Sequence, residues 1–126
     1  MTKFPFRRVH FTGIGGIGMS AIAEMVQALG VAVQGSDQKE NDNIVRLKNK
    51  GIPVFIGQKP ENIQGADALI YSTATKDNIE VQTALTQGLS VAHRSEMLAE
   101  LLKLKQSICV AGTHGKTTTS SLMLVS

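Results

Sequence analysis

A glycine-rich turn between a short apolar segment and a helical pattern constrains the fold of this chain more than any other feature. Residues 13–18 read Gly-Ile-Gly-Gly-Ile-Gly and fit the spacing G-x-G-x-x-G. The apolar segment 8–12 before them predicts a strand, and apolar residues at helical spacing from Met19 to Leu29 predict a helix that Gly30 ends. In this context the backbone amides at the helix start can face the phosphates of a nucleotide. A glycine turn without a ligand is the alternative.

Strand-like and helix-like segments continue to alternate after this turn. Further strands are expected at 31–35, 53–56, 67–71, 90–92 and 106–110, and further helices at 43–50, 78–87 and 95–104 with Ser95 as the cap of the last. This alternation predicts an α/β fold with a Rossmann-like parallel sheet and helices on both faces, a three-layer α/β/α arrangement. Such sheets bind ligands beyond the carboxyl ends of their strands, where the strand order reverses. The candidate binding segments all follow predicted strands: 13–18, 36–37, 72–73, 93–94 and 112–117.

Composition favours a globular protein over a disordered or membrane-spanning one. The chain has 126 residues, of which 42% are hydrophobic and 18% charged, enough for one domain with its own core. A net charge of +3 suits an anionic ligand but is too small to indicate a nucleic-acid partner. The single cysteine, Cys109, and the lack of an apolar run of about 20 residues predict a soluble cytoplasmic protein with no membrane partner. The oligomeric state stays open.

Asp37 lies at the end of the second predicted strand, 19 residues after Gly18. An acidic residue at this place contacts a ribose hydroxyl in dinucleotide-binding folds, so an NAD-binding redox module is one hypothesis. Capping of a turn or helix is the other role for this side chain. A dehydrogenase also needs a catalytic domain, for which we expect no room in this chain.

A second glycine loop follows the last predicted strand. Its Gly-Lys-Thr core at residues 115–117 is typical of a P-loop, in which Lys116 reaches the terminal phosphates and Thr117 binds Mg²⁺. The spacing departs from the full pattern, because its first glycine would fall at Val110. Since nine residues follow Thr117, we expect a domain over 1–106 and the start of a truncated ATP-binding domain, a strand plus this loop, over 107–126, without ATP turnover.

The two glycine loops together resemble those of the Mur ligase family. The resemblance rests on residues 9–20, 35–37, 94–98 and 111–118, in this order. It implies an enzyme of three domains that bind, in turn, the UDP part of UDP-N-acetylmuramate, ATP with Mg²⁺, and L-alanine. ATP would phosphorylate the muramyl carboxylate, and the alanine amine would attack the acyl phosphate. A ligase for recycled murein tripeptide shares this plan and is the alternative.

The resemblance also implies site residues. A UDP-substrate site would comprise the first turn, the uridine contacts after the second strand, and a wall after the fourth: Gly13, Gly15, Gly16, Ile17, Gly18, Met19, Ser20, Ser36, Asp37, Ser72, Thr73 and Ala74. An ATP site would comprise Gly112, Thr113, His114, Gly115, Lys116, Thr117 and Thr118. The chain departs from the family in two segments: Gln58 stands where a histidine is common, and Ser72-Thr73-Ala74-Thr75 replaces Ser-Ser-Ala-Ile.

His93 and Arg94 follow the fifth predicted strand. Both suit a phosphate or carboxylate contact, and the arginine can bind such a group in bidentate fashion. A solvated surface arginine is the alternative. The three histidines are too scattered in sequence to predict a zinc site, and no catalytic residue is assigned.

Overall fold

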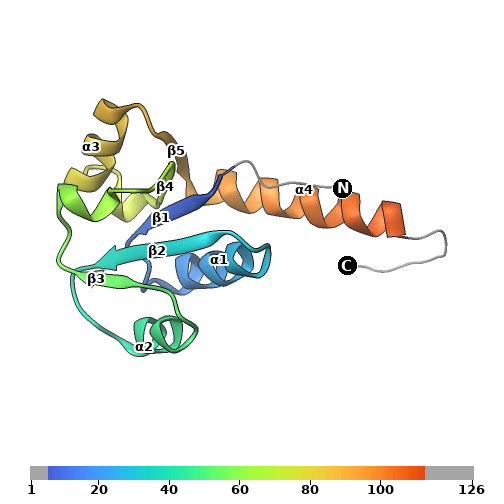
Figure 1. The fold of residues 1–126 in the computed structure, drawn as a ribbon, viewed down its shortest axis with the longest axis horizontal. Helices are drawn as coiled ribbons and strands as arrows, with labels where there is room; N and C mark the ends of the chain where they lie inside the picture. Colours follow the sequence, from blue (N-terminus) through green and yellow to red (C-terminus); the bar gives the residue numbers. More distant parts are fainter. Residues whose placement is uncertain (1–5, 113–126) are drawn as a thin grey trace.

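A computed structural model describes residues 6–112, in which five β-strands form one sheet flanked by helices (Figure 1). The strands are β1 (Arg8–Thr12), β2 (Ala32–Asp37), β3 (Val54–Ile56), β4 (Ala68–Tyr71) and β5 (Ser90–His93). The α-helices are α1 (Ile17–Ala28), α2 (Asp42–Asn49), α3 (Ile79–Gln87) and α4 (Arg94–Gly112), and two 3-10 turns are η1 (Pro60–Ile63) and η2 (Thr73–Thr75). The predicted α/β class is confirmed.

The sheet is parallel throughout, with the strand order β3-β2-β1-β4-β5. The chain builds outward from β1 through β2 to β3, then returns to the other side of β1 for β4 and β5. Thr12 lies opposite Ser36, and Phe11 lies opposite Ile70. The carboxyl ends of β1, β2 and β4 therefore meet at one edge, and the order reverses between β1 and β4.

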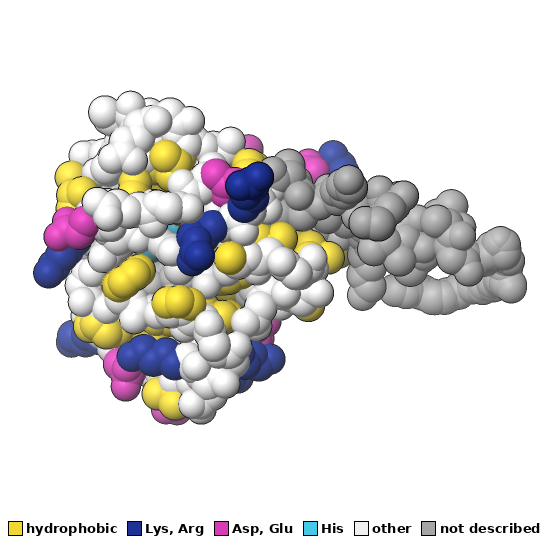
Figure 2. Space-filling model, in the orientation of Figure 1, with side chains coloured by type: hydrophobic (Ala, Val, Ile, Leu, Met, Phe, Trp, Pro, Cys, Tyr) yellow, Lys and Arg dark blue, Asp and Glu magenta, His cyan; other side chains and the backbone are white. Residues whose placement is uncertain are grey.

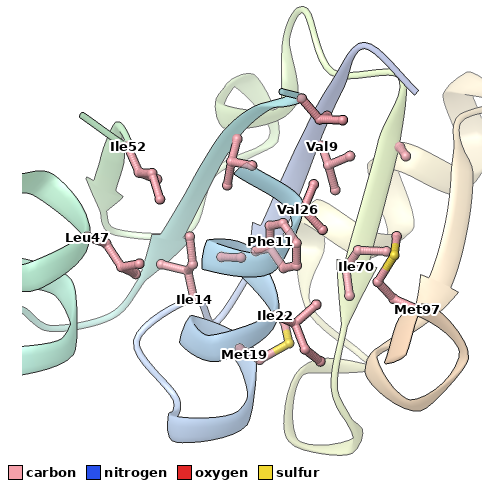
Figure 3. Packing of buried hydrophobic residues seen from close by; sticks show 14 of the residues in the cluster. Val9, Phe11, Ile14, Met19, Ile22, Val26, Leu47, Ile52, Ile70 and Met97 are labelled. Atoms are coloured by element: carbon pink, nitrogen blue, oxygen red, sulfur yellow. The ribbon is translucent and has the colours of Figure 1, made fainter. Parts of the chain in front are cut away.

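One face of the sheet carries the main apolar core (Figure 3). Phe11 of β1 and Ile70 of β4 pack there against α1, α2 and α4. Burying one such side chain completely stabilises the fold by about 1.5–3 kcal/mol. Ile22 and Val26 point into this core, whereas Met25 and Leu29, which share their helical spacing, remain 38% and 41% exposed.

The opposite face is covered by α3 and η1, so the three-layer arrangement is confirmed. A smaller cluster around Leu69 and Val81 fills the space under β4. Under β1 and β2 the same face is polar instead, because His10 and Gln34 point to it from neighbouring strands and are both buried. Buried polar side chains of this kind need hydrogen-bond partners within the protein.

Gly35 of β2 allows the glycine turn to pack directly on the sheet. A Cβ atom at this position would lie 2.5 Å from Cδ1 of Ile14 and 2.8 Å from the carbonyl oxygen of Phe11. No side chain fits at such distances without displacing the turn. The Ile14 side chain therefore anchors the turn to the core through the space that Gly35 leaves.

The strand predicted at 106–110 is wrong. The helix α4 begins at Arg94 and continues through Gly112, so the described residues contain five strands rather than six. A strand must pair with a neighbour to satisfy its backbone groups, whereas a helix satisfies them within itself. The predicted start at Ser95 is also one residue late, because the Glu96 carboxylate accepts a hydrogen bond of 2.7 Å from the His93 amide just before the helix.

The charged side chains are mixed in sign on the face of the molecule that Figure 2 shows. Basic and acidic groups lie scattered there among apolar and uncharged ones, without a continuous basic stripe. Within residues 6–112, none of the helices combines the length and the apolar character that a bilayer crossing needs.

Candidate functional site

A cavity of about 640 Å³ opens at the carboxyl edge of the sheet, where the strand order reverses. Its walls come from the turns after β1, β2 and β4, from the segment after β3, and from the start of α4. The residues that line it are Gly13, Gly16, Gly18, Met19, Asp37, Gln38, Gln58, Ser72, Thr73, Ala74, Thr75 and Arg94. This volume is in the usual range of small-molecule sites, about 300–1,000 Å³.

The floor of the cavity is the glycine turn that leads into α1. Gly13 has φ of +79°, a left-handed conformation that favours glycine, and its amide donates a hydrogen bond of 2.9 Å to the carbonyl of Ser36. The Ile14 amide donates to the same oxygen at 2.9 Å, and Gly16 then caps α1. The first turn of a helix leaves its amide groups without intrahelical acceptors and carries partial positive charge. This end of α1 therefore suits an anion.

Arg94 faces that helix end from the start of α4. A Cβ atom on Gly18 would lie 3.0 Å from Nη1 of Arg94, which shows how closely the guanidinium approaches α1. Among the described residues, no carboxylate forms an ion pair with Arg94. The guanidinium and the helix end thus bring positive charge to one side of the cavity, where a phosphate group could bind both.

The wall beside the glycine turn is the 3-10 turn η2, whose conformation is fixed by its own side chains. Ser72 and Thr75 form a capping box, with the Ser72 amide donating to Oγ1 of Thr75 at 3.0 Å. Oγ1 of Thr73 lies 3.0 Å from Nε2 of His93, and that imidazole also contacts the ring of Tyr71 edge-on. Hydroxyl groups and backbone therefore dominate this wall.

Gln58 adds a side-chain amide to the cavity from the segment after β3. Its Oε1 atom accepts a hydrogen bond of 2.6 Å from Nδ2 of Asn78, the residue that caps α3. This bond leaves the two N–H groups of the Gln58 amide for other partners. The position that departs from the family pattern thus contributes directly to the cavity.

Glu80 of α3 lies beneath the cavity and is completely buried, with 0% of its surface exposed. Its Oε1 atom accepts from Nε2 of His10 at 2.8 Å, and from the hydroxyls of Thr12 at 2.9 Å and Ser36 at 2.6 Å. Its Oε2 atom accepts from the Lys59 amide at 3.1 Å and from Nδ2 of Asn62 at 2.8 Å.

Hydrogen bonding decides the protonation of Glu80. Burial opposes ionisation and raises the pKa, but hydrogen bonds from His10, Ser36 and Asn62 to the charged form outweigh it and lower the pKa to about 2. Nε2 of Gln34 donates a hydrogen bond to the Asn62 carbonyl at 2.7 Å and lies 2.9 Å from Nδ1 of His10. Because an amide NH₂ group can only donate, it also donates to Nδ1. The imidazole therefore accepts at Nδ1 and donates to Glu80 from Nε2.

The sequence profile described as "Mur ligase family, catalytic domain" matches residues 8–106, most of the chain. The chain belongs to the Mur ligase family. It is 54% identical over 123 residues to a UDP-N-acetylmuramate–L-alanine ligase of Hyphomonas neptunium, covering 97% of this chain and 26% of that protein. A protein of the same name from Bradyrhizobium sp. BTAi1 is 56% identical over 116 residues, which are 91% of this chain and 25% of the relative. This Mur ligase chain thus spans about a quarter of the length of these curated relatives.

Solved structures place this Mur ligase chain in the same family. The UDP-N-acetylmuramate–alanine ligase of Thermotoga maritima is similar with a TM-score of 0.73 and 34% identity, over 76% of this chain and 23% of that one. A murein peptide ligase from Psychrobacter arcticus has a TM-score of 0.69 and 27% identity, over 75% of this chain and 20% of that one.

Many residues predicted for the UDP-substrate site of this Mur ligase chain meet around the cavity. The predicted residues among its lining are Gly13, Gly16, Gly18, Met19, Asp37, Ser72, Thr73, Ala74 and Arg94. The predicted residues outside the lining are Gly15, Ile17, Ser20, Ser36 and His93. Whether the residues that line the cavity contact a ligand stays a prediction.

The predicted residues outside the lining form contacts within the protein or face solvent. The hydroxyl of Ser36 donates to Glu80, and the hydroxyl of Ser20 donates to the Ile17 carbonyl at 3.0 Å. Ile17 itself is 85% exposed. His93 is hydrogen-bonded to Thr73, which lines the cavity, so it contacts the cavity wall without lining the cavity itself.

Gly15 faces the β2–α2 segment rather than the cavity. Its amide donates to Oδ2 of Asp37 at 2.9 Å, and its carbonyl accepts from Nδ2 of Asn43 at 2.9 Å. A Cβ atom here would lie 2.8 Å from Oδ2 of Asp37. Gly15 is therefore needed for packing inside the protein. Asp37 accepts backbone hydrogen bonds from Gly15 and Gln38 and also lines the cavity, and its contact with a ribose stays a prediction.

The sequence did not predict that Gln58, Gln38 and Thr75 line the cavity, and it gave no role to the buried Glu80. A signal for Glu80 was present, since His10 and Thr12 alternate along β1 on the same face as Gln34 and Ser36 of β2. Such a polar patch on a buried sheet face requires a polar partner.

The predicted ATP site cannot be placed against this cavity. Gly112 is the last residue of α4, and residues 113–118, with the Mg²⁺ ligand Thr117, lie outside the described residues. Among the described residues, no cluster of histidine, cysteine and acidic side chains could hold a metal ion.

Proposed function

We propose that this chain binds UDP-N-acetylmuramate as the N-terminal part of an ATP-dependent ligase that joins L-alanine to this substrate in peptidoglycan synthesis. One observation carries the proposal: the cavity at the sheet's carboxyl edge combines the N-terminus of α1 with Arg94, which has no partner carboxylate among the described residues. This pairing suits a diphosphate. The names of the relatives supply the rest of the substrate.

The proposed chemistry lies beyond the cavity described here. The muramyl carboxylate would take the γ-phosphoryl group of ATP, releasing ADP, and the alanine amine would displace phosphate from the acyl phosphate to form an amide. ATP and Mg²⁺ would bind at residues 112–118, and this assignment rests on the Gly-Lys-Thr pattern. The described residues would bind and orient the UDP part of the substrate. A cytoplasmic location fits the supply of ATP and belongs to the same proposal.

The test is a titration of the chain with UDP-N-acetylmuramate, UDP, NAD and ATP. Calorimetry measures binding, and thermal unfolding measures the shift of the midpoint. We expect the two uridine ligands to bind and to raise the unfolding midpoint, with a stabilisation of about 2.7 kcal/mol at a ligand concentration of 100 times Kd. A midpoint shift with NAD and none with the uridine ligands would overturn the proposal in favour of a redox module.

Arg94→Gln makes the titration specific for the cavity. Loss of a charge-assisted hydrogen bond should cost about 1.5–3 kcal/mol of UDP-binding free energy. Arg7→Gln is the matched control, because this exposed arginine lies just before β1, at the opposite edge of the sheet, and does not line the cavity. Equal affinities for the two variants would place the diphosphate elsewhere.

The murein tripeptide ligase remains the second candidate, supported by the likeness to the Psychrobacter arcticus structure. In the full-length protein, release of ADP that depends on L-alanine favours the alanine-adding ligase. Release that depends on the tripeptide and not on L-alanine favours the recycling ligase.

A further inference from the structure

We propose that Glu80 is a positioning residue, whose buried carboxylate holds the glycine turn and the Gln58 segment in the geometry that the cavity needs. The proposal rests on the proposed function only for the identity of the ligand. Glu80 is not among the residues that line the cavity. Any effect it has on binding must therefore pass through the backbone segments that it holds.

The first connection runs from Oε1 of Glu80 to the glycine turn. This atom accepts hydrogen bonds from the hydroxyls of Thr12 and Ser36. Thr12 directly precedes Gly13, and the Ser36 carbonyl accepts the amides of Gly13 and Ile14, both at 2.9 Å. The carboxylate thus holds the end of β1, from which the turn continues, and the end of β2, to which the turn is hydrogen-bonded.

The second connection runs from Oε2 to the segment after β3. This atom accepts from the Lys59 amide and from Nδ2 of Asn62. Nδ2 of Asn62 also donates to the Gly57 carbonyl at 2.8 Å, so both chain neighbours of Gln58 are held. Because Gln58 lines the cavity, the same carboxylate sets the position of a second wall.

A carboxylate is required because all of its partners here are donors. The Lys59 amide cannot accept a hydrogen bond, and the donation from Gln34 to Nδ1 leaves His10 donating at Nε2. A glutamine at position 80 would turn its NH₂ group toward one of these donors and leave donors unpaired in a buried place. A turn that is rigid before the ligand arrives avoids the cost of ordering it on binding.

The experiment compares Glu80→Gln with Val81→Ala in this chain. Val81 is the next residue of α3 and is buried in the apolar cluster on the α3 side of the sheet. Its side chain has no hydrogen-bonding group, so the substitution removes none of the donors to Glu80. Amide hydrogen exchange of the ligand-free protein and calorimetric titration with UDP are measured well below both unfolding midpoints.

We expect Glu80→Gln to speed exchange at Gly13, Ile14 and Lys59 and to weaken UDP binding about tenfold or more. Val81→Ala should lower the unfolding midpoint while leaving exchange at these amides and the UDP affinity near wild type. Ser36→Ala is a milder variant in case Glu80→Gln fails to fold. It should speed exchange at Gly13 and Ile14 but not at Lys59, with a smaller loss of affinity.

Unchanged exchange at Gly13 and Ile14 in both Glu80→Gln and Ser36→Ala would overturn the positioning role. So would affinity losses that are equal in Glu80→Gln and Val81→Ala, because they would reflect stability alone. If the wild-type chain bound no uridine ligand, the proposed function would be wrong, and the exchange measurements would still decide whether Glu80 holds the turn.

Discussion

At the residue scale, Glu80 carries a negative charge where water has no access, and only protein donors hold that charge. Donors on β1, β2 and the segment from 59 to 62 converge on its two oxygen atoms. Removing one member of such a network leaves the others unpaired, which costs more than the lost hydrogen bond itself. Glu80 thus affects stability as well as the shape of the cavity.

The stability of the chain should depend on pH through Glu80. Its pKa is lowered from 4.5 to about 2 in the folded protein, so the charged form is stabilised by folding. This contribution, about 3 kcal/mol from the size of the shift, is complete above pH 4.5 and is lost as the pH falls toward 2. Urea unfolding of wild type and Glu80→Gln over this range measures it. The difference between the two curves should shrink toward acid pH, and a constant difference would contradict the assignment.

At the element scale, the start of α3 organises both Glu80 and Gln58. Oδ1 of Asn78 accepts the Glu80 amide at 2.9 Å and so caps the helix, while its Nδ2 group donates to Gln58. One asparagine therefore sets where the helix begins and which way a cavity side chain points. The helix start, more than the sheet, determines this side of the site.

Asn78→Ala should lower the free energy of unfolding by about 1 kcal/mol, the usual cost of losing an N-cap. Thr86→Ala on the exposed side of α3 is the control and should change it by less than about 0.5 kcal/mol. Chemical denaturation measures both variants. Equal effects would mean that the Asn78 cap does not stabilise α3.

At the scale of the whole molecule, α4 joins the core through its first two turns. Met97 and Leu101 are buried there, and Leu98 packs partly against the same cluster, whereas Leu102 is 48% exposed. The described side chains that connect α4 to the sheet therefore all lie before residue 102. Figure 1 shows the rest of the helix extending away from the sheet.

Removal of residues 107–126 should leave the free energy of unfolding within about 0.5 kcal/mol of the full chain, because the buried residues of α4, Met97 and Leu101, are retained. Leu101→Ala should cost about 3 kcal/mol through the cavity it leaves in the core. Thermal and urea unfolding of both variants test the predicted domain limit at residue 106. A large loss on truncation would show that the segment belongs to the first domain.

The sequence by itself determined the parallel α/β fold and the place of the glycine turn. Local patterns suffice for both, because the apolar residues of β1, α1 and β2 fall at strand and helix spacing and residues 13–16 separate the first two. The same local reasoning failed at 106–110, where apolar residues suit a strand or a helix and only a neighbouring strand could decide.

Only the tertiary structure decided which residues of the turn face the cavity and what holds them. Gly15 is a glycine of the G-x-G-x-x-G motif and Gly16 is not, yet Gly16 lines the cavity. The amide and carbonyl of Gly15 are used instead by Asp37 and Asn43, which are distant in sequence. Glu80 meets His10 and Ser36 only because parallel pairing aligns β1 with β2 and the start of α3 brings its carboxylate to their polar face. Alternation along a strand can indicate a buried polar face, but it does not name the distant residue that pairs with that face, so such contacts appear only once the chain has folded.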